Sequence, residues 1–192
     1  MRRTLLITLA VLLCSFYAVA QDYPKGQLFG GLSLVHIDSE GVQIPGLKIW
    51  YPGFEIGPQY NFTKMFGIEA DLRANFGTPV KLVRPARSWS FLTGPVVSLR
   101  GERFTPFVHA LLGFNAIGIS NTSITDTDLG MALGGGLDVK LGRHFSARVG
   151  QFDYFYTKHD ICKVAGMGGA ACEAAIPNHQ NNFSFATGIV VH

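Results

Sequence analysis

The sequence predicts an all-β protein, an eight-stranded antiparallel up-and-down transmembrane β-barrel preceded by a cleaved signal peptide. Three observations support this prediction. Apolar and polar residues alternate in segments of about ten residues, the connections between these segments are alternately short and long, and the composition is unusually apolar. Of the 192 residues, 47% are hydrophobic and 15% are charged, whereas charged residues make up about 25% of an ordinary soluble domain. Much of the surface must therefore face something other than water.

The first twenty residues have the features of an export signal. Two arginines precede an apolar run, Leu5–Leu13, and Ala18–Ala20 supplies the small-x-small pattern that signal peptidase recognises. The apolar run is shorter than the roughly 20 residues that a membrane-spanning helix needs. We therefore expect residues 1–20 to be a signal peptide and residues 21–192 to form one barrel domain. Cleavage removes the two arginines and no acidic residue, so the net charge of +3 becomes +1, which gives no basic footprint for nucleic acid.

The first three predicted strands are 28–37, 54–62 and 66–76. In the second, one face carries aromatic, aliphatic and proline residues, and the other carries glycine and polar residues. The third strand is the most regular, because its even-numbered residues are all apolar and its odd-numbered residues are glycine, charged or amide. The link between these two strands, 61–66, is short enough for a tight hairpin.

The next three strands repeat this design. The fourth, 89–99, keeps large apolar residues, threonine and proline on one face, and a turn at 101–103 leads toward the fifth, 107–118. The sixth, 128–140, sets leucine, methionine and valine opposite glycine and charged residues. A second short turn, 141–144, leads to the seventh strand.

The seventh strand, 145–156, changes phase within its length. Arg148 lies at an even position, whereas Gln151 and Asp153 lie at odd positions. A bulge inserts one extra residue, so a bulge near Gly150 would place all three on the same face. The eighth strand, 183–192, again alternates regularly.

Short connections follow the second, fourth and sixth strands, and long ones follow the odd-numbered strands and lie at 38–52, 77–87, 119–127 and 157–182. Short turns at one end and long loops at the other are typical of outer-membrane barrels. A soluble lipocalin-like carrier would also have eight strands, but its core would have to hold aromatic residues from nearly every strand. Eight strands enclose only a narrow interior, so we expect glycine and polar residues inside and the apolar face toward lipid. Tyr60, Phe62, Phe66, Trp89 and Tyr154 are candidates for interfacial aromatic girdles.

This orientation places charges of both signs inside the barrel. The expected interior network consists of Glu55, Glu69, Asp71, Arg73, Arg100, Asp138, Lys140 and Arg148. Buried charges persist when they are paired and hydrogen-bonded, so we interpret these residues as structural ion pairs rather than catalytic groups or a selectivity ring. His109 is expected to be a satisfied interior histidine.

Two cysteines, Cys162 and Cys172, remain after export. In an oxidising compartment they are expected to form one disulfide, which would stabilise the chain by roughly 3 kcal/mol. A metal site with His159 and His179 is the alternative, but the spacing fits no closed zinc pattern. A lipoprotein signal at Cys14 is disfavoured, because a leucine occupies the position where a small residue should precede the cysteine. No cofactor is expected.

Several stretches resemble one family. They are Arg103–Ala110 with Gly113, Met131–Lys140, Arg148–Tyr154, and Gln180–Val191. They are similar to strands of the OmpA/OmpX-like outer membrane protein β-barrel family, and the likeness covers essentially the whole mature chain. The resemblance implies an eight-stranded barrel in the outer membrane of a Gram-negative bacterium and insertion by the barrel-assembly machinery. Members typically end in an aromatic residue, whereas this sequence ends Val191-His192.

The resemblance does not imply one activity. We expect a non-enzymatic integral membrane protein, a monomer in contact with outer-membrane lipid and lipopolysaccharide, whose loops serve structural or surface-interaction roles. A small pore is one alternative, although the narrow interior disfavours it. A lipid-modifying enzyme of the lipid A deacylase type is another, but such an enzyme carries a serine two residues after its histidine, and here His179 is followed by Asn181.

Overall fold

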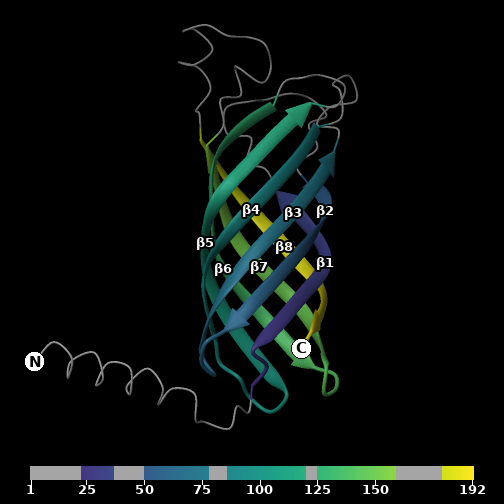
Figure 1. Cartoon of the computed structure of the whole chain (residues 1–192). Helices are drawn as coiled ribbons and strands as arrows, with labels where there is room; N and C mark the ends of the chain where they lie inside the picture. Colours follow the sequence, from purple (N-terminus) through teal and green to yellow (C-terminus); the bar gives the residue numbers. More distant parts are fainter. Residues whose placement is uncertain (1–22, 37–49, 78–85, 120–124, 159–178) are drawn as a thin grey trace, which may run out of the picture.

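The computed structural model describes residues 23–36, 50–77, 86–119, 125–158 and 179–192 (Figure 1). Its strands are β1 (Gly26–His36), β2 (Trp50–Asn61), β3 (Phe66–Gly77), β4 (Ala86–Ser98), β5 (Phe104–Ile119), β6 (Thr125–Lys140), β7 (Phe145–Lys158) and β8 (His179–Val191). Each strand pairs antiparallel with the next in the sequence, and β8 pairs with β1 to close the barrel. The predicted fold is confirmed. Within the described ranges, no helix is long and apolar enough to cross a membrane.

The strands are longer than the alternation alone predicts. β2 begins at Trp50 rather than at residue 54, and β6 begins at Thr125 rather than at residue 128. At the start of β2 the inward residue Tyr51 is aromatic, and at the start of β6 the outward residue Thr127 is polar, so the predicted alternation stops there while backbone pairing continues. The segments 1–22, 37–49, 78–85, 120–124 and 159–178 lie outside the described residues. The expected signal peptide and disulfide fall within them.

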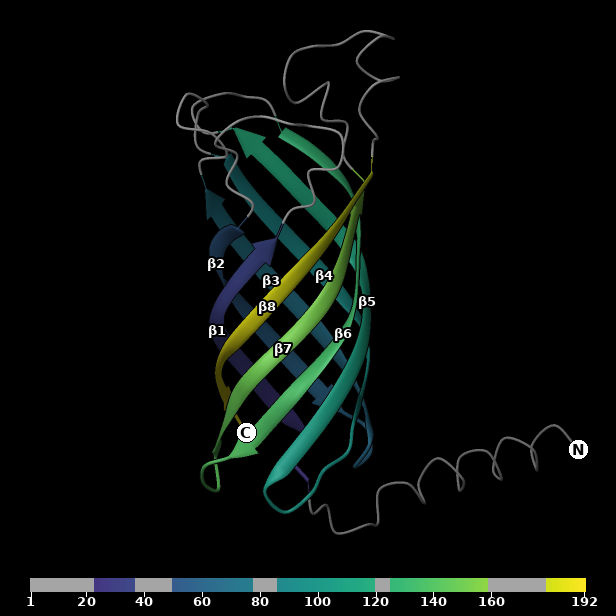
Figure 2. The same cartoon turned by 180° about the vertical axis from the view of Figure 1, so that it is seen from behind.

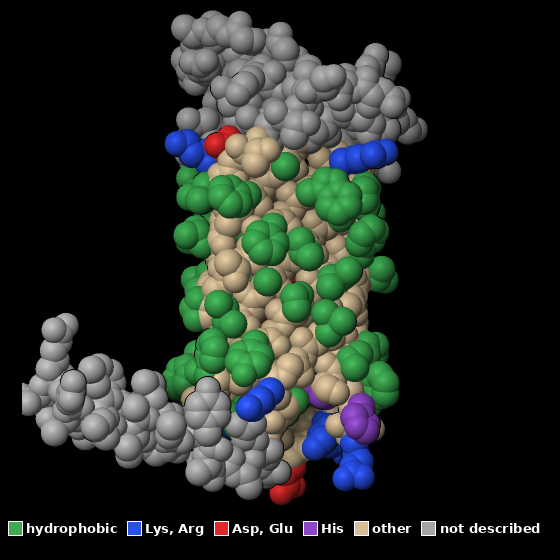
Figure 3. All heavy atoms as spheres, in the orientation of Figure 1, with side chains coloured by type: hydrophobic (Ala, Val, Ile, Leu, Met, Phe, Trp, Pro, Cys, Tyr) green, Lys and Arg blue, Asp and Glu red, His purple; other side chains and the backbone are tan. Residues whose placement is uncertain are grey.

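The barrel wall is apolar on the outside and polar on the inside. In β3, Phe66, Ile68 and Leu72 are exposed, whereas the carboxylates and guanidinium between them are buried. Figure 3 shows hydrophobic side chains over the visible wall from one end of the described barrel to the other. The expected girdle residues Tyr60, Phe62, Phe66, Trp89 and Tyr154 are all on this outer surface. The face that sequence alternation assigned to lipid is therefore the outer face.

The predicted bulge is present in β7. Arg148 pairs with Gly188 of β8, and the next regular pair is Gln151 with Ala186, so two residues of β7 oppose one of β8. Arg148, Gln151 and Asp153 are all buried as a result. The bulge thus delivers three polar side chains of one strand to the barrel interior.

The two ends of the barrel differ. The turns after β2, β4 and β6 and the described C-terminal end lie together at one end, drawn at the bottom in Figure 1, and Figure 2 shows the same arrangement from behind. We call this the short-turn end. The strand ends that flank the four long connections lie at the opposite end.

A buried ionic network as the candidate functional site

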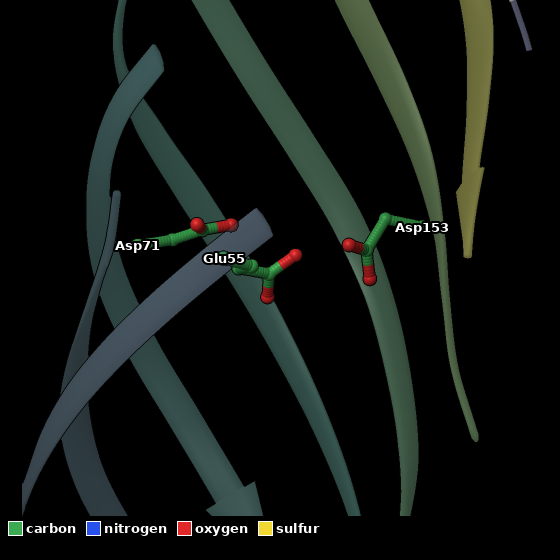
Figure 4. A group of neighbouring side chains, drawn as sticks. All are labelled: Glu55, Asp71 and Asp153. Atoms are coloured by element: carbon green, nitrogen blue, oxygen red, sulfur yellow. The ribbon is translucent and has the colours of Figure 1, made fainter. Parts of the chain in front are cut away.

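The centre of the barrel holds a guanidinium surrounded by three carboxylates. Arg73 Nη2 lies 3.0 Å from Glu55 Oε2, 2.6 Å from Asp71 Oδ2 and 2.8 Å from Asp153 Oδ2. These carboxylates come from β2, β3 and β7, and Figure 4 shows them converging on one region of the interior. All four side chains are about 1% exposed, so the cluster is excluded from water.

The same three carboxylates could supply ligands to a metal ion, because their oxygens lie within 4.8 Å of one another. In this barrel the Arg73 guanidinium lies among them and within salt-bridge distance of each. Their charge is therefore balanced by a side chain of the protein itself. The arrangement is that of an ion-pair network rather than of a cation site.

A histidine extends the network toward β5. His109 Nδ1 lies 2.9 Å from Glu69 Oε2, and its Nε2 lies 3.0 Å from Asp153 Oδ1. A carboxylate only accepts hydrogen bonds, so both contacts are satisfied when the ring carries a proton on each nitrogen. The imidazole then acts as a third interior cation that links two carboxylates from different strands.

A second guanidinium joins the network to the short-turn side of the interior. Arg148 Nε donates to Asp138 Oδ1 at 2.9 Å, and its Nη1 donates to Gln151 Oε1 at 2.7 Å. Gln151 Nε2 in turn donates to Glu55 and Asp153 at 2.9 and 3.0 Å. The buried amide therefore connects the surroundings of the two arginines.

Aromatic rings lie on both sides of the Arg73 cluster along the barrel. The Arg148 guanidinium lies 4.3 Å from the ring centre of Phe29 and 4.1 Å from that of Phe107, and Phe107 precedes His109 on the short-turn side of β5. On the other side, Phe155 follows Asp153 along β7 and packs in a buried apolar cluster with Leu92, Leu111 and Ala132. Its ring centre is 5.6 Å from the Arg73 guanidinium. Rings therefore lie on the short-turn side and on the long-connection side of the Arg73 cluster, while Asp138, which lies opposite Thr105 and Arg148, is beyond Phe107 toward the short-turn end.

Strand register explains why these residues meet. Glu55 lies directly opposite Arg73 in the β2–β3 pair, and Asp138 lies directly opposite Arg148 in the β6–β7 pair. Asp153 lies opposite Gly134, where a Cβ atom would stand 2.2 Å from Asp153 Oδ1. The glycine leaves the volume that the carboxylate occupies.

The structure brings together six of the eight residues that the sequence assigned to the interior: Glu55, Glu69, Asp71, Arg73, Asp138 and Arg148. Arg100 is half-buried nearer the short-turn end, where its Nη2 donates to Gln27 Oε1 at 3.2 Å. Lys140 differs from the expectation. It is the last residue of β6 and its side chain is exposed, because the strand leaves the barrel there.

The sequence-based set omitted two central residues, Gln151 and Asp153. Asp153 contacts both Arg73 and His109, so it holds two cations of the network. The signal that identifies it is the bulge at Gly150, which moves both omitted residues to the same face as Arg148. His109 has the satisfied interior position that was expected of it.

A serine–histidine contact lies at the short-turn end. Ser146 Oγ is 2.7 Å from His192 Nε2, and Gln27 Nε2 is 2.7 Å from His192 Nδ1. Gln27 Oε1 accepts hydrogen bonds from Asn61 and Arg100, which fixes its amide with the NH₂ group toward the histidine. His192 Nδ1 is therefore an acceptor and its Nε2 carries the proton. Burial lowers the pKa of His192 below its ordinary value, in agreement with a neutral ring.

This tautomer is the reverse of the one a serine nucleophile needs. A general base must present an unprotonated nitrogen to the hydroxyl, whereas here the protonated Nε2 faces Ser146. The contact is a structural hydrogen bond that ties the residue after β8 to the start of β7. It does not form a catalytic pair.

Comparisons with known proteins agree with this architecture. The family model described as outer membrane protein beta-barrel domain matches residues 6–185. Among solved structures, the chain is similar to Ail, the attachment invasion locus protein of Yersinia pestis, with 15% identity, 86% of this chain and 96% of that chain covered, and a TM-score of 0.52. Neisserial surface protein A is 11% identical, with 88% of this chain and 97% of that chain covered and a TM-score of 0.60. OprG from Pseudomonas aeruginosa is 14% identical, with 86% of this chain and 94% of that chain covered and a TM-score of 0.52. No curated protein sequence matches significantly.

Proposed function

The chain belongs to the outer membrane protein β-barrel domain family, whose place is the bacterial outer membrane, and from this premise we propose that it is a non-enzymatic barrel with a closed interior. In this role the barrel is a rigid holder for its long connections, which serve structural or surface-interaction functions. The observation that carries the proposal is the central ionic network with aromatic rings on both sides. A pore would need continuous water through this level.

Two features support the absence of catalysis. Ser146 faces the protonated nitrogen of His192, so it lacks a base. Asn181, at the position where a lipid A deacylase-like enzyme would carry its serine, accepts a hydrogen bond from the Tyr154 hydroxyl at 2.5 Å. An asparagine amide cannot act as that nucleophile.

The remaining parts of the proposal concern biogenesis and surroundings. Residues 1–20 are removed on export, and residues 21–192 are inserted by the barrel-assembly machinery as a monomer. Cys162 and Cys172 are joined in the oxidising periplasm. The apolar outer wall contacts outer-membrane lipid and lipopolysaccharide, as its exposed leucine and phenylalanine residues favour.

The test begins with the full chain expressed in a Gram-negative host and extracted from the outer membrane. A closed barrel predicts different gel mobilities for boiled and unboiled samples. In planar bilayers the proposal predicts no conductance steps, with a known porin as the positive control. Vesicles of phospholipid and lipopolysaccharide should yield no released acyl chains.

Variants separate the barrel from its connections. Replacement of 159–178 by a short glycine-serine turn should preserve heat-modifiable mobility, because Lys158 and His179 on either side of it are already paired at the ends of β7 and β8. Regular single-channel steps from the natural chain would establish a pore and refute the closed-interior proposal. Acyl-chain release that persists after removal of contaminating enzymes would refute the non-enzymatic role.

A further inference from the structure

The short-turn end of the barrel has a strongly basic surface. Its exposed cations, which we call the basic rim, are Lys25, Lys64, Arg103, Lys140 and Arg143. Among the described residues of this end, 23–27, 62–66, 98–104, 140–146 and 192, the acidic side chain is Glu102. Half-buried Arg100 adds a further positive charge. The end therefore carries a clear excess of positive charge, and blue side chains gather there in Figure 3.

Backbone hydrogen bonds hold the segments of the rim next to one another. Asn61 N donates to Lys25 O at 2.7 Å, and Ser98 N donates to Met65 O at 2.8 Å. Lys140 N donates to Arg103 O at 2.9 Å. The cations therefore lie on neighbouring segments whose backbones are fixed relative to one another around the barrel mouth.

Large apolar side chains flank the cations on the outer wall. Phe62 and Phe66 lie on either side of Lys64 in the sequence of the first short turn, and both are more than half exposed, at 60% and 55%. Phe104 follows Arg103, and Phe145 closes the turn that contains Arg143, with exposures of 55% and 52%. Aromatic groups next to cations mark the boundary between acyl chains and headgroups.

The rim therefore stands at headgroup depth. We propose that the basic rim binds the phosphates of anionic phospholipids in the leaflet that meets the short turns, which in this family is the periplasmic one. This inference rests on the proposed membrane-embedded function. The matching chemistry is a fixed array of ammonium and guanidinium groups against a layer of phosphate monoanions.

The position of the cations favours lipid over a soluble polyanion. Each short turn combines a cation with an outward apolar side chain, so a bound group should have an anionic head and an adjoining acyl chain. A soluble periplasmic polymer would contact the charges from the periplasmic side and would make no contact with the flanking phenylalanines on the outer wall. The described opposite end offers a matched comparison, because its exposed basic residues include one arginine and one lysine, Arg87 and Lys158.

The test compares two double variants with equal chemistry. One is Lys64→Gln with Arg143→Gln in the rim, and the other is Lys158→Gln with Arg87→Gln at the long-connection end. The barrel extracted from outer membranes is titrated in detergent with phosphatidylglycerol or phosphatidylcholine, and bound lipid is counted by native mass spectrometry. A cation near an anionic surface contributes about a fivefold gain in association at low ionic strength.

The natural chain should prefer phosphatidylglycerol, and millimolar inorganic phosphate should not displace it. The rim variant lacks two cations worth about fivefold each, so its preference should fall by up to about 25-fold and by at least about fivefold, whereas the matched control should keep it. Neutralisation of all five rim residues to glutamine should abolish the preference. Equal loss in rim and control variants, or no preference in the natural chain, would overturn the inference.

Heat-modifiable mobility of each variant separates failure of this inference from failure of the proposed function. A rim variant that remains a closed barrel and keeps its preference for phosphatidylglycerol would refute the lipid-binding role of the rim and leave the proposed function untouched. A natural chain that forms no closed barrel refutes both proposals. Rim-dependent sedimentation with purified peptidoglycan, without lipid preference, would assign the surface to that polymer and overturn the lipid proposal.

Discussion

Replacement of Arg73 by methionine tests the central ionic network most directly. Methionine keeps much of the side-chain length but removes the charge and the donors. Three carboxylate oxygens within 3.0 Å of Arg73 Nη2 would then share one buried region without their common cation. His109 and Arg148 remain, but His109 contacts only Asp153 of these three acids.

The expected loss can be bounded. Removal of one partner of a buried ion pair costs about 3–5 kcal/mol, because it leaves an uncompensated charge. Arg73 serves three acids from one nitrogen, so we expect a destabilisation at the upper end, about 5 kcal/mol. This is comparable with the whole stability of many domains, about 5–15 kcal/mol.

The assay is urea unfolding of the barrel in lipid vesicles, followed by tryptophan fluorescence. Both tryptophans, Trp50 and Trp89, are more than half exposed on the outer wall, so unfolding transfers them from lipid to water. The matched control is Arg87→Met, since Arg87 is exposed and its loss should cost less than about 1 kcal/mol. A second variant adds Glu55→Gln and Asp71→Asn to Arg73→Met. It should recover much of the lost stability, because two of the uncompensated charges are gone.

Two results would refute this reasoning. An Arg73→Met barrel within about 1 kcal/mol of the natural chain would mean that water or rearranged side chains satisfy the carboxylates. A triple variant less stable than Arg73→Met would mean that shape and hydrogen bonding, rather than charge, dominate at this position.

Three further predictions use the same unfolding assay. Gly134→Ala should destabilise the barrel by about 1–3 kcal/mol, because the new methyl group would stand 2.2 Å from Asp153 Oδ1. The control is Gly142→Ala, since no atom lies within 4 Å of a Cβ at that position. Equal effects of the two substitutions would contradict the steric argument. Arg148→Lys should lower the free energy of unfolding by about 2 kcal/mol although the positive charge is kept, because lysine cannot donate to Asp138 and Gln151 at once or stack on Phe107 as the guanidinium does. An unchanged urea midpoint would contradict this prediction. The pKa of His192 is lowered in the folded chain, so the stability that this residue contributes is complete above the unfolded-state pKa of about 6.5 and falls as the pH drops below that value. The difference in unfolding free energy between the natural chain and His192→Gln should therefore be larger at pH 7.5 than at pH 5. The reverse trend would refute the neutral tautomer.

The barrel itself could be predicted because period-two alternation is a local signal. In β3, Phe66, Ile68 and Leu72 are exposed and Glu69, Asp71 and Arg73 are buried, as parity predicts. The bulge in β7 could also be predicted, because a change of polar phase within one strand indicates one inserted residue. Strand ends were less accurate, since alternation stops before backbone pairing does, as at the inward Tyr51 of β2 and the outward Thr127 of β6.

The composition of the network depends on depth, which alternation does not encode. Lys140 and Asp138 share a face of β6, but Lys140 is the last residue of the strand and reaches the surface. Arg100 is similarly displaced toward the mouth. The contacts of Asp153 with residues of β3 and β5 cross the barrel and require the closed three-dimensional arrangement. Pairing partners across the lumen could therefore not be predicted from parity.

A charged interior has a specific advantage in a barrel that is surrounded by lipid. In water, burial of apolar groups distinguishes the inside of a sheet from its outside, but acyl chains are as apolar as a hydrophobic core. A register slip of one residue exchanges the two faces of a strand. For β3 such a slip would carry Glu69, Asp71 and Arg73 into lipid, where arginine alone costs about 2–4 kcal/mol near the bilayer midplane and acidic residues cost somewhat less. The cost of that slip is comparable with the expected effect of Arg73→Met. The ionic network thus fixes which face points inward in the strands that carry its charges, β2, β3, β5, β6 and β7.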